Sequence, residues 1–191
     1  MSVLLDAGPA LNFLAVGQQN LLIQIASQSG LDLQAPERID KEVLGKVNDP
    51  RFQRTGVEST WKKLKFAGRL QILSDDITDP LFATAISRIS GVPASQRVRT
   101  GKDLGEIMVM AHASVLVQAG VDVYVLMDEG DGRQIVKREQ MWLTSKGAVG
   151  SLVLWSTRQV LEHAASQGWL PDGWQRVYNR MRQFDDGLPR L

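Results

Sequence analysis

The sequence predicts an α/β fold: a single three-layer α/β/α domain built on a central, mostly parallel sheet. Short apolar runs alternate along the chain with longer segments of helical periodicity. Strands that alternate with helices favour a parallel sheet covered on both faces. The length of 191 residues fits one domain and is sufficient to bury a core.

The expected strands are short and rich in branched apolar residues. They comprise residues 3–5, 31–35, 70–73, 121–127 and 142–144. The run 121–127 is apolar almost throughout, which is typical of a strand buried on both faces.

The expected helices lie between these strands and are bounded by capping and breaking residues. Pro9 suits a first helical turn, Gly17 ends that helix, and Asp79 before Pro80 is a typical N-cap. The helices cover residues 9–16, 21–29, 37–47, 57–68, 79–90, 103–118, 132–140, 151–167 and 171–182. Residues 1–150 then form the core of the domain, with a helical insertion near 48–68, and residues 151–191 form C-terminal helices packed on the same domain.

Composition narrows the functional classes. The net charge of +1 provides no overall basic field for nucleic acid, so such binding would depend on local patches. The absence of cysteine excludes disulfides, thiolate zinc sites and cysteine nucleophiles. The N-terminal residues do not form a signal peptide, and no apolar run approaches the roughly 20 residues that span a bilayer. We expect a soluble, cytoplasmic protein that does not bind membranes.

Four acidic groups stand beside apolar runs, where an unpaired carboxylate would be costly to bury. Asp6 and Asp128 directly follow expected strands, so both should lie at the carboxyl edge of the sheet, where ligands of such folds bind. Glu42 and Glu106 lie on expected helices. If the fold brings these carboxylates together, they form an oxygen-ligand site for a hard divalent cation.

Each acidic group also has a purely structural interpretation. Asp6 could cap the helix that follows it, and Glu42 could be a solvated helix residue. Asp103 and Glu106 have the spacing of a capping box, and the acids around Gly130 could be ordinary turn residues. The joint pattern, without competing chemistry elsewhere in the chain, favours a shared site.

Four segments together resemble the motifs of the PIN-domain family. They are residues 3–14 (Val-Leu-Leu-Asp-Ala-Gly-Pro-Ala-Leu-Asn-Phe-Leu), 36–43 (Pro-Glu-Arg-Ile-Asp-Lys-Glu-Val), 104–113 (Leu-Gly-Glu-Ile-Met-Val-Met-Ala-His-Ala) and 125–133 (Val-Leu-Met-Asp-Glu-Gly-Asp-Gly-Arg). The resemblance runs from residue 3 to about 145 with motif order and spacing intact. The chain departs from many relatives in having Ala7 and Gly8 where a hydroxyl residue follows the first Asp, and Glu where the third acid is more commonly Asp.

The resemblance implies an Mg²⁺- or Mn²⁺-dependent ribonuclease, often the toxin of a toxin–antitoxin pair (VapC-type). The implied partners are RNA and a small antitoxin protein, and a homodimer is plausible by the same resemblance. Asn12 and Asp103 would orient the metal ligands without binding the metal themselves, although Asp103 also suits a helix cap. The implied catalytic and metal-binding residues are Asp6, Glu42, Glu106 and Asp128, with Asp131 as a further metal ligand and Glu129 as a possible helper.

Basic residues flank the third and fourth motifs and could contact RNA phosphates beside the acidic site. They are Arg97, Arg99 and Lys102 before the third motif, and Arg133, Lys137 and Arg138 after the fourth. Solvated surface charge is the equally weighted alternative. The five tryptophans are too scattered along the sequence to predict a base-stacking platform, so core or interface packing is favoured.

Two other functions compete with the nuclease. The first is a PIN-like scaffold that binds RNA or protein with little or no catalysis, which the missing hydroxyl after Asp6 favours. The second is a metal-dependent phosphohydrolase on an unrelated α/β fold. That hypothesis lacks support because the chain has no glycine-rich phosphate loop and no Asp-x-Asp nucleophile motif at Asp6.

Overall fold

The computed structural model describes residues 1–28, 30–128 and 130–191, and the side chains of these residues except Gly130 and Asp131. Glu129, the side chain of Asp131 and the expected helix end at Ser29 therefore lie outside the described residues. The described chain forms a five-stranded parallel sheet in the order β3-β2-β1-β4-β5. The predicted α/β/α fold class is confirmed.

The sheet is centred on its first strand. Ser2 in β1 pairs with Asp32 in β2 on one side and with Val123 in β4 on the other, and Val123 pairs with Leu152 in β5. All four residues of β1 are buried, as expected for a strand with neighbours on both edges and helices on both faces. The strands are β1 (Ser2–Leu5), β2 (Asp32–Pro36), β3 (Gln71–Leu73), β4 (Val123–Leu126) and β5 (Leu152–Trp155).

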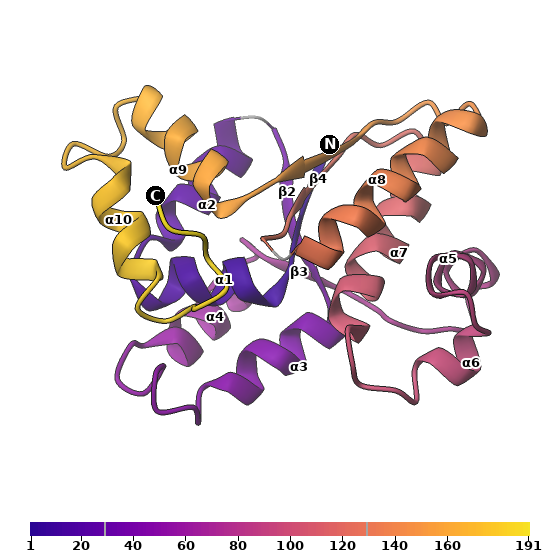
Figure 1. Cartoon of the computed structure of the whole chain (residues 1–191), viewed down its shortest axis with the longest axis horizontal. Coiled ribbons are helices and arrows are strands. Elements are labelled where there is room, and N and C mark those ends of the chain that lie inside the picture. Colours follow the sequence, from indigo (N-terminus) through magenta and orange to yellow (C-terminus); the bar gives the residue numbers. More distant parts are fainter. Residues whose placement is uncertain (29, 129) are drawn as a thin grey trace.

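Helices cover both faces of the sheet (Figure 1). One side carries α1, α2, α9 and α10, and the other carries α7 and α8 with α5 outside them. The helices are α1 (Ala7–Ala15), α2 (Gln19–Gln28), α3 (Glu37–Lys46), α4 (Val57–Phe66), α5 (Pro80–Ser90), α6 (Ala94–Arg97), α7 (Leu104–Gln118), α8 (Gly130–Ser145), α9 (Thr157–Ser166) and α10 (Trp174–Met181).

Two predicted elements near the C-terminus are wrong. Residues 142–144 belong to α8 rather than to a strand, and the last strand is β5, where a helix was expected to begin. Leu143 continues the buried face of α8. The guanidinium of Arg88 packs on the ring of Trp142, with Arg88 Cζ 3.5 Å from the ring centre. Short apolar runs fit either structure, so pairing with β4 decides between them. The expected loop 91–102 also contains the short helix α6.

Helix α7 is held in the core of the protein. Most of α7 is buried, because one side packs against the sheet and the other against α5 through Phe82, Ile86 and Met108. Trp61 is 1% exposed, and its indole N–H donates to Asp40 at 2.7 Å. This tryptophan therefore has the packing role that was predicted.

No helix among the described residues combines the length and apolar character needed to cross a membrane.

The turn that leads into β5 generates a stability prediction. A Cβ atom at Gly150 would lie 2.3 Å from the carbonyl oxygen of Val121 and 2.9 Å from that of Val117. Backbone atoms cannot rotate away, so we expect Gly150→Ala to lower the free energy of unfolding by about 2–3 kcal/mol in a urea titration. Gly45→Ala is the matched control, because it meets no atom within 4 Å and should add about 0.5–1 kcal/mol. Equal stability of the two variants would contradict this account of the turn.

Candidate functional site

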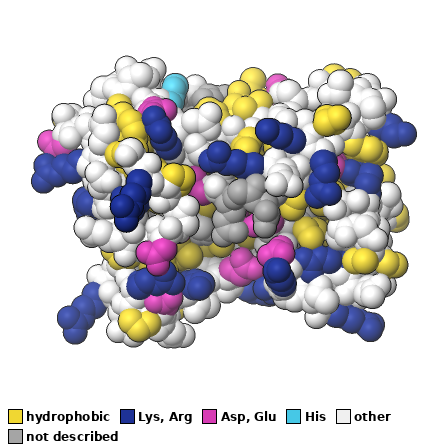
Figure 2. Space-filling view, viewed as in Figure 1, with side chains coloured by type: hydrophobic (Ala, Val, Ile, Leu, Met, Phe, Trp, Pro, Cys, Tyr) yellow, Lys and Arg dark blue, Asp and Glu magenta, His cyan; other side chains and the backbone are white. Residues whose placement is uncertain are grey.

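A pocket of about 700 Å³ opens at the carboxyl edge of the sheet. Its walls come from the start of α1, from α3 and the connection after it, from the start of α7 and from the C-terminal tail. Figure 2 shows acidic side chains across the middle of this face, with lysine and arginine side chains around them. The acidic residues that line the pocket are Asp6, Glu42, Asp49, Asp103, Glu106 and Asp185.

Asp6 and Glu106 are the most deeply placed of these acids. Asp6 is 6% exposed and Glu106 is 7% exposed. Asp6 follows β1, and its backbone N–H donates to the carbonyl of Leu126 at the end of β4. Asp6 occupies the N-cap position of α1, as the capping interpretation expects, but its side chain makes no capping hydrogen bond to that helix. The structure therefore brings both carboxylates to the pocket lining.

Asp103 does not form the expected capping box with Glu106. It occupies the N-cap position of α7 with a left-handed backbone (φ 53°), and its side chain makes no capping hydrogen bond. Asp tolerates this region better than most residues, yet the conformation is uncommon and often marks a functional segment. Asp103 is exposed at the pocket wall, one helical turn before Glu106.

Glu42 reaches the pocket in a paired state. Its carboxylate accepts a hydrogen bond from Arg38 Nε at 2.6 Å, one turn earlier on α3. A Cβ atom at Gly105 would lie 2.8 Å from Glu42 Oε2, so the carboxylate packs directly against the first turn of α7. Glu42 therefore lies between the guanidinium of Arg38 and the N-terminal turn of α7.

Asp185 is a pocket acid that the sequence did not predict. Asn12, which is 1% exposed, donates from Nδ2 to Asp185 Oδ2 at 2.7 Å. The tail is held nearby because Phe184 stacks on Phe52 at 5.9 Å and its carbonyl accepts from Arg51 at 3.3 Å. Asn12 therefore orients a carboxylate, as expected, but one that arrives from the other end of the chain. The acidic pair at 185–186 was its only sequence signal.

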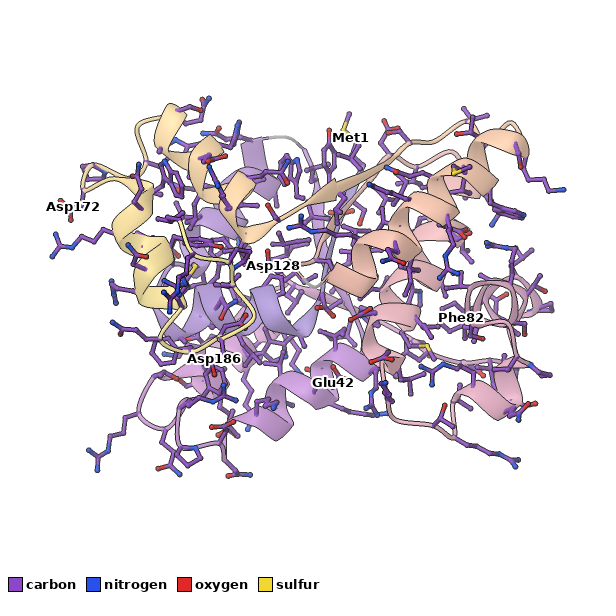
Figure 3. All side chains as sticks on the ribbon, viewed as in Figure 1. Met1, Glu42, Phe82, Asp128, Asp172 and Asp186 are labelled. Atoms are coloured by element: carbon purple, nitrogen blue, oxygen red, sulfur yellow. The ribbon has the colours of Figure 1, made fainter. Side chains whose placement is uncertain are left out.

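Asp128 is not among the residues that line this pocket. Figure 3 labels it beyond the end of β4, with Glu42 on α3 and Asp186 on the C-terminal tail. Its carboxylate accepts hydrogen bonds from the backbone N–H and the hydroxyl of Thr157 at the start of α9. Burial raises the pKa of Asp128, the two Thr157 bonds oppose this, and the charge of Asp185 adds to it. Asp128 thus ties β4 to α9.

The predicted RNA-binding residues have different surroundings. Arg97 is engaged within its own loop, where its guanidinium donates to the carbonyls of Thr100 and Lys102. The remaining members are exposed: Arg99 and Lys102 before α7, and Arg133, Lys137 and Arg138 on α8.

Three further cations line the pocket itself and were missed from the sequence: Arg38, Lys46 and Arg51. Arg51 pairs with Asp49 at 2.9 Å. Hydrogen bonds from the side chain and backbone of Arg51 lower the pKa of Asp49 to about 2.

The donor set has the right chemistry for Mg²⁺ or Mn²⁺, because these ions prefer carboxylate oxygens. As the side chains stand, however, no three acidic or histidine side chains in the described part of the chain are grouped closely enough to hold a metal ion. A metal ion held only by the described side chains would therefore require the carboxylates around the pocket to rotate toward one another. Mutual repulsion of these acids is the force that a cation would relieve.

The raised pKa of Asp128 generates a prediction about pH. Folding disfavours its ionised form, so its contribution to stability falls as pH rises through the folded pKa. We expect Asp128→Asn to gain stability relative to the wild type between pH 4 and pH 7, measured by urea unfolding with EDTA present. Asp122→Asn is the control, because hydrogen bonds from Ser151 lower the pKa of Asp122, so its contribution is lost only as pH falls below about 4 and should stay nearly constant in this window. A stability difference for Asp128→Asn that stays constant with pH would contradict the effect of burial.

Comparison with known proteins gives no family assignment. No protein-family model matches the chain, and neither a curated protein nor a solved structure matches it. The resemblance of the four motifs to PIN domains stays a prediction, and the pocket itself is the basis on which a function is proposed.

Proposed function

We propose that the protein is an Mg²⁺- or Mn²⁺-dependent endoribonuclease that hydrolyses RNA phosphodiester bonds. The observation that supports this proposal is the convergence of Asp6, Glu42, Glu106 and Asp185 on one open pocket at the carboxyl edge of a parallel sheet. Ligands of parallel α/β folds bind at that edge. A role as the toxin of a toxin–antitoxin pair, an antitoxin partner and a homodimer stay predictions from the motif resemblance.

The pocket residues divide naturally into roles. Asp6 and Glu106 are the principal metal ligands, because they are the most buried acids of the pocket and lie directly after the buried strand β1 and in the buried first turn of α7. Asp185, oriented by Asn12, is a third ligand. A divalent metal ion bound there supplies an activated water and stabilises the charge that develops on the phosphate oxygens.

Glu42 and Asp128 act less directly in this assignment. Glu42 forms a salt bridge with Arg38. This pair places a guanidinium at the pocket, where it could bind a phosphate group of the substrate. Asp128 fixes the start of α9 through Thr157, and its charge interacts with that of Asp185 in the pocket lining. Its expected role as a direct ligand would require it to exchange the Thr157 bonds for a metal.

A second candidate is a binding scaffold without catalysis. It is favoured by the absence of a ready-made group of three metal-binding side chains in the described residues and by the occupied hydrogen bonds of Asp128. The same pocket would then bind RNA or a protein partner through its charged walls. Metal-dependent cleavage of RNA is expected of the nuclease and not of the scaffold.

The cleavage test is direct. Purified protein with a labelled structured RNA pool and Mn²⁺ should generate products that EDTA abolishes. Asp6→Asn and Glu106→Gln should each lower the cleavage rate about 100-fold or more, because both remove a principal ligand. Glu58→Gln on α4 is the matched control, since Glu58 is exposed and pairs with Lys62 away from the pocket. Cleavage that survives both EDTA and Asp6→Asn would refute the proposal, and Mn²⁺ binding without cleavage would favour the scaffold.

The role of the tail acid has its own test. Asn12→Ala should weaken Mn²⁺ binding about 10- to 100-fold, because it removes the donor that orients Asp185. Free Mn²⁺ would be followed by electron paramagnetic resonance, with folding checked by circular dichroism. Asp185→Asn should weaken binding as well, whereas Asn179→Ala on the exposed side of α10 should leave it unchanged. Unaltered Mn²⁺ affinity in a folded Asp185→Asn variant would exclude Asp185 as a ligand.

A further inference from the structure

One part of the pocket lining contains aromatic residues as well as charged ones. It is formed by the end of α3, the connection that follows it and the C-terminal tail. It carries Lys46 and Arg51 beside Phe52 and Phe184, together with the acids Asp49 and Asp185, so cations and aromatic surface lie side by side there. Cations that track the phosphates and aromatic rings that stack on bases are the two features that bind single-stranded nucleic acid.

The charges on this wall are not equivalent. Arg38 is matched by Glu42 at 2.6 Å, and Arg51 is matched by Asp49 at 2.9 Å. Lys46 makes no ion pair with any residue that the structure describes, and it is exposed in the last turn of α3. Among the described residues, Lys46 is thus the pocket cation that no salt bridge holds, and at longer range its charge helps to lower the pKa of Asp49.

The aromatic part of the wall is held in place from several directions. Phe184 is partly exposed and stacks on the buried Phe52 with ring centres 5.9 Å apart. The guanidinium of Arg51 lies 5.9 Å from the centre of the Phe52 ring and donates to the Phe184 carbonyl. Asp185 is fixed by Asn12, so the residue after Phe184 is anchored as well. An aromatic ring positioned in advance loses little conformational entropy on binding a base.

We propose that Lys46 and Phe184 form a nucleotide subsite beside the acidic site. Lys46 binds a backbone phosphate, Phe184 stacks on the adjoining base, and Arg51 positions the tail. The occupant is one nucleotide of a single-stranded RNA, because a base must be unpaired to stack on a ring in a pocket. This inference rests on the proposed function for its substrate, and it assigns to the C-terminal tail the role of placing that substrate.

The test measures binding without catalysis. A fluorescein-labelled single-stranded oligoribonucleotide would be titrated with protein in EDTA, and fluorescence anisotropy would be followed at several salt concentrations. Lys46→Ala should weaken binding and lower the slope of log K against log salt by about 0.7, the value for one phosphate contact on a single strand. Phe184→Leu should weaken binding about tenfold and leave that slope unchanged, whereas Phe184→Trp should retain affinity.

Matched controls come from α4, which carries the same residue types away from the pocket. Lys63→Ala and Phe66→Ala should bind as the wild type does, because Lys63 is exposed and Phe66 is 96% exposed and neither lines the pocket. Circular dichroism would establish that each variant is folded. Wild-type affinity in both Lys46→Ala and Phe184→Leu, equal losses in the α4 controls, or no binding by the wild type would overturn the subsite.

The result is separable from the nuclease proposal. Binding that depends on Lys46 and Phe184, in a protein that never cleaves RNA with Mn²⁺, would sustain the subsite and reject the enzyme. Cleavage that depends on Asp6 but is indifferent to Lys46 and Phe184 would do the reverse. A duplex of the same sequence should bind more weakly than the single strand, and equal affinity for the two would contradict stacking on Phe184.

Discussion

The pocket depends on the position of β1 at the centre of a parallel sheet. Because β1 pairs with both β2 and β4, the residue that follows it emerges between two strand ends. The backbone N–H of Asp6 continues the ladder by donating to Leu126, and the chain then turns directly into α1. A strand at the sheet edge would have left this carboxylate in solvent. Here it is buried yet faces the opening that α3 and α7 frame.

Gathering so many carboxylates has a cost that the fold offsets locally. Two helix N-termini point at the region, since α1 begins just after Asp6 and α7 begins where Glu42 packs on Gly105. Each helix terminus favours negative charge by about 0.3–1 kcal/mol. Arg38 also pairs directly with Glu42, and Arg51 pairs with one further acid, Asp49. Arg38 and Arg51 thus pair with acids that are more exposed than the buried Asp6 and Glu106.

The parts of the fold that follow local patterns could be predicted, and those that follow distant contacts could not. The apolar run before Asp6 is enough to place that residue at the carboxyl edge, and Asp79 caps α5 as its sequence context suggests. The strand at Leu152–Trp155 is recognisable only through its pairing with β4, because its local pattern equally fits a helix. Asp128 was predicted to face the ligand, but its direction is decided by Thr157, 29 residues later. No local signal connects Asn12 with Asp185, which are 173 residues apart.

That last contact shows why the composition of the pocket is a property of the whole chain. Asn12 is almost completely buried on α1, and a buried amide without a partner would be costly. Asp185 meets that requirement, and in doing so it draws the C-terminal tail over the opening where Arg51 and Phe52 also hold Phe184. Three contacts from two separate segments thus fix a stretch of chain that has no regular secondary structure. The hydrogen bond that gives the buried Asn12 amide a partner therefore also places the Asp185 carboxylate and the Phe184 ring in the pocket lining.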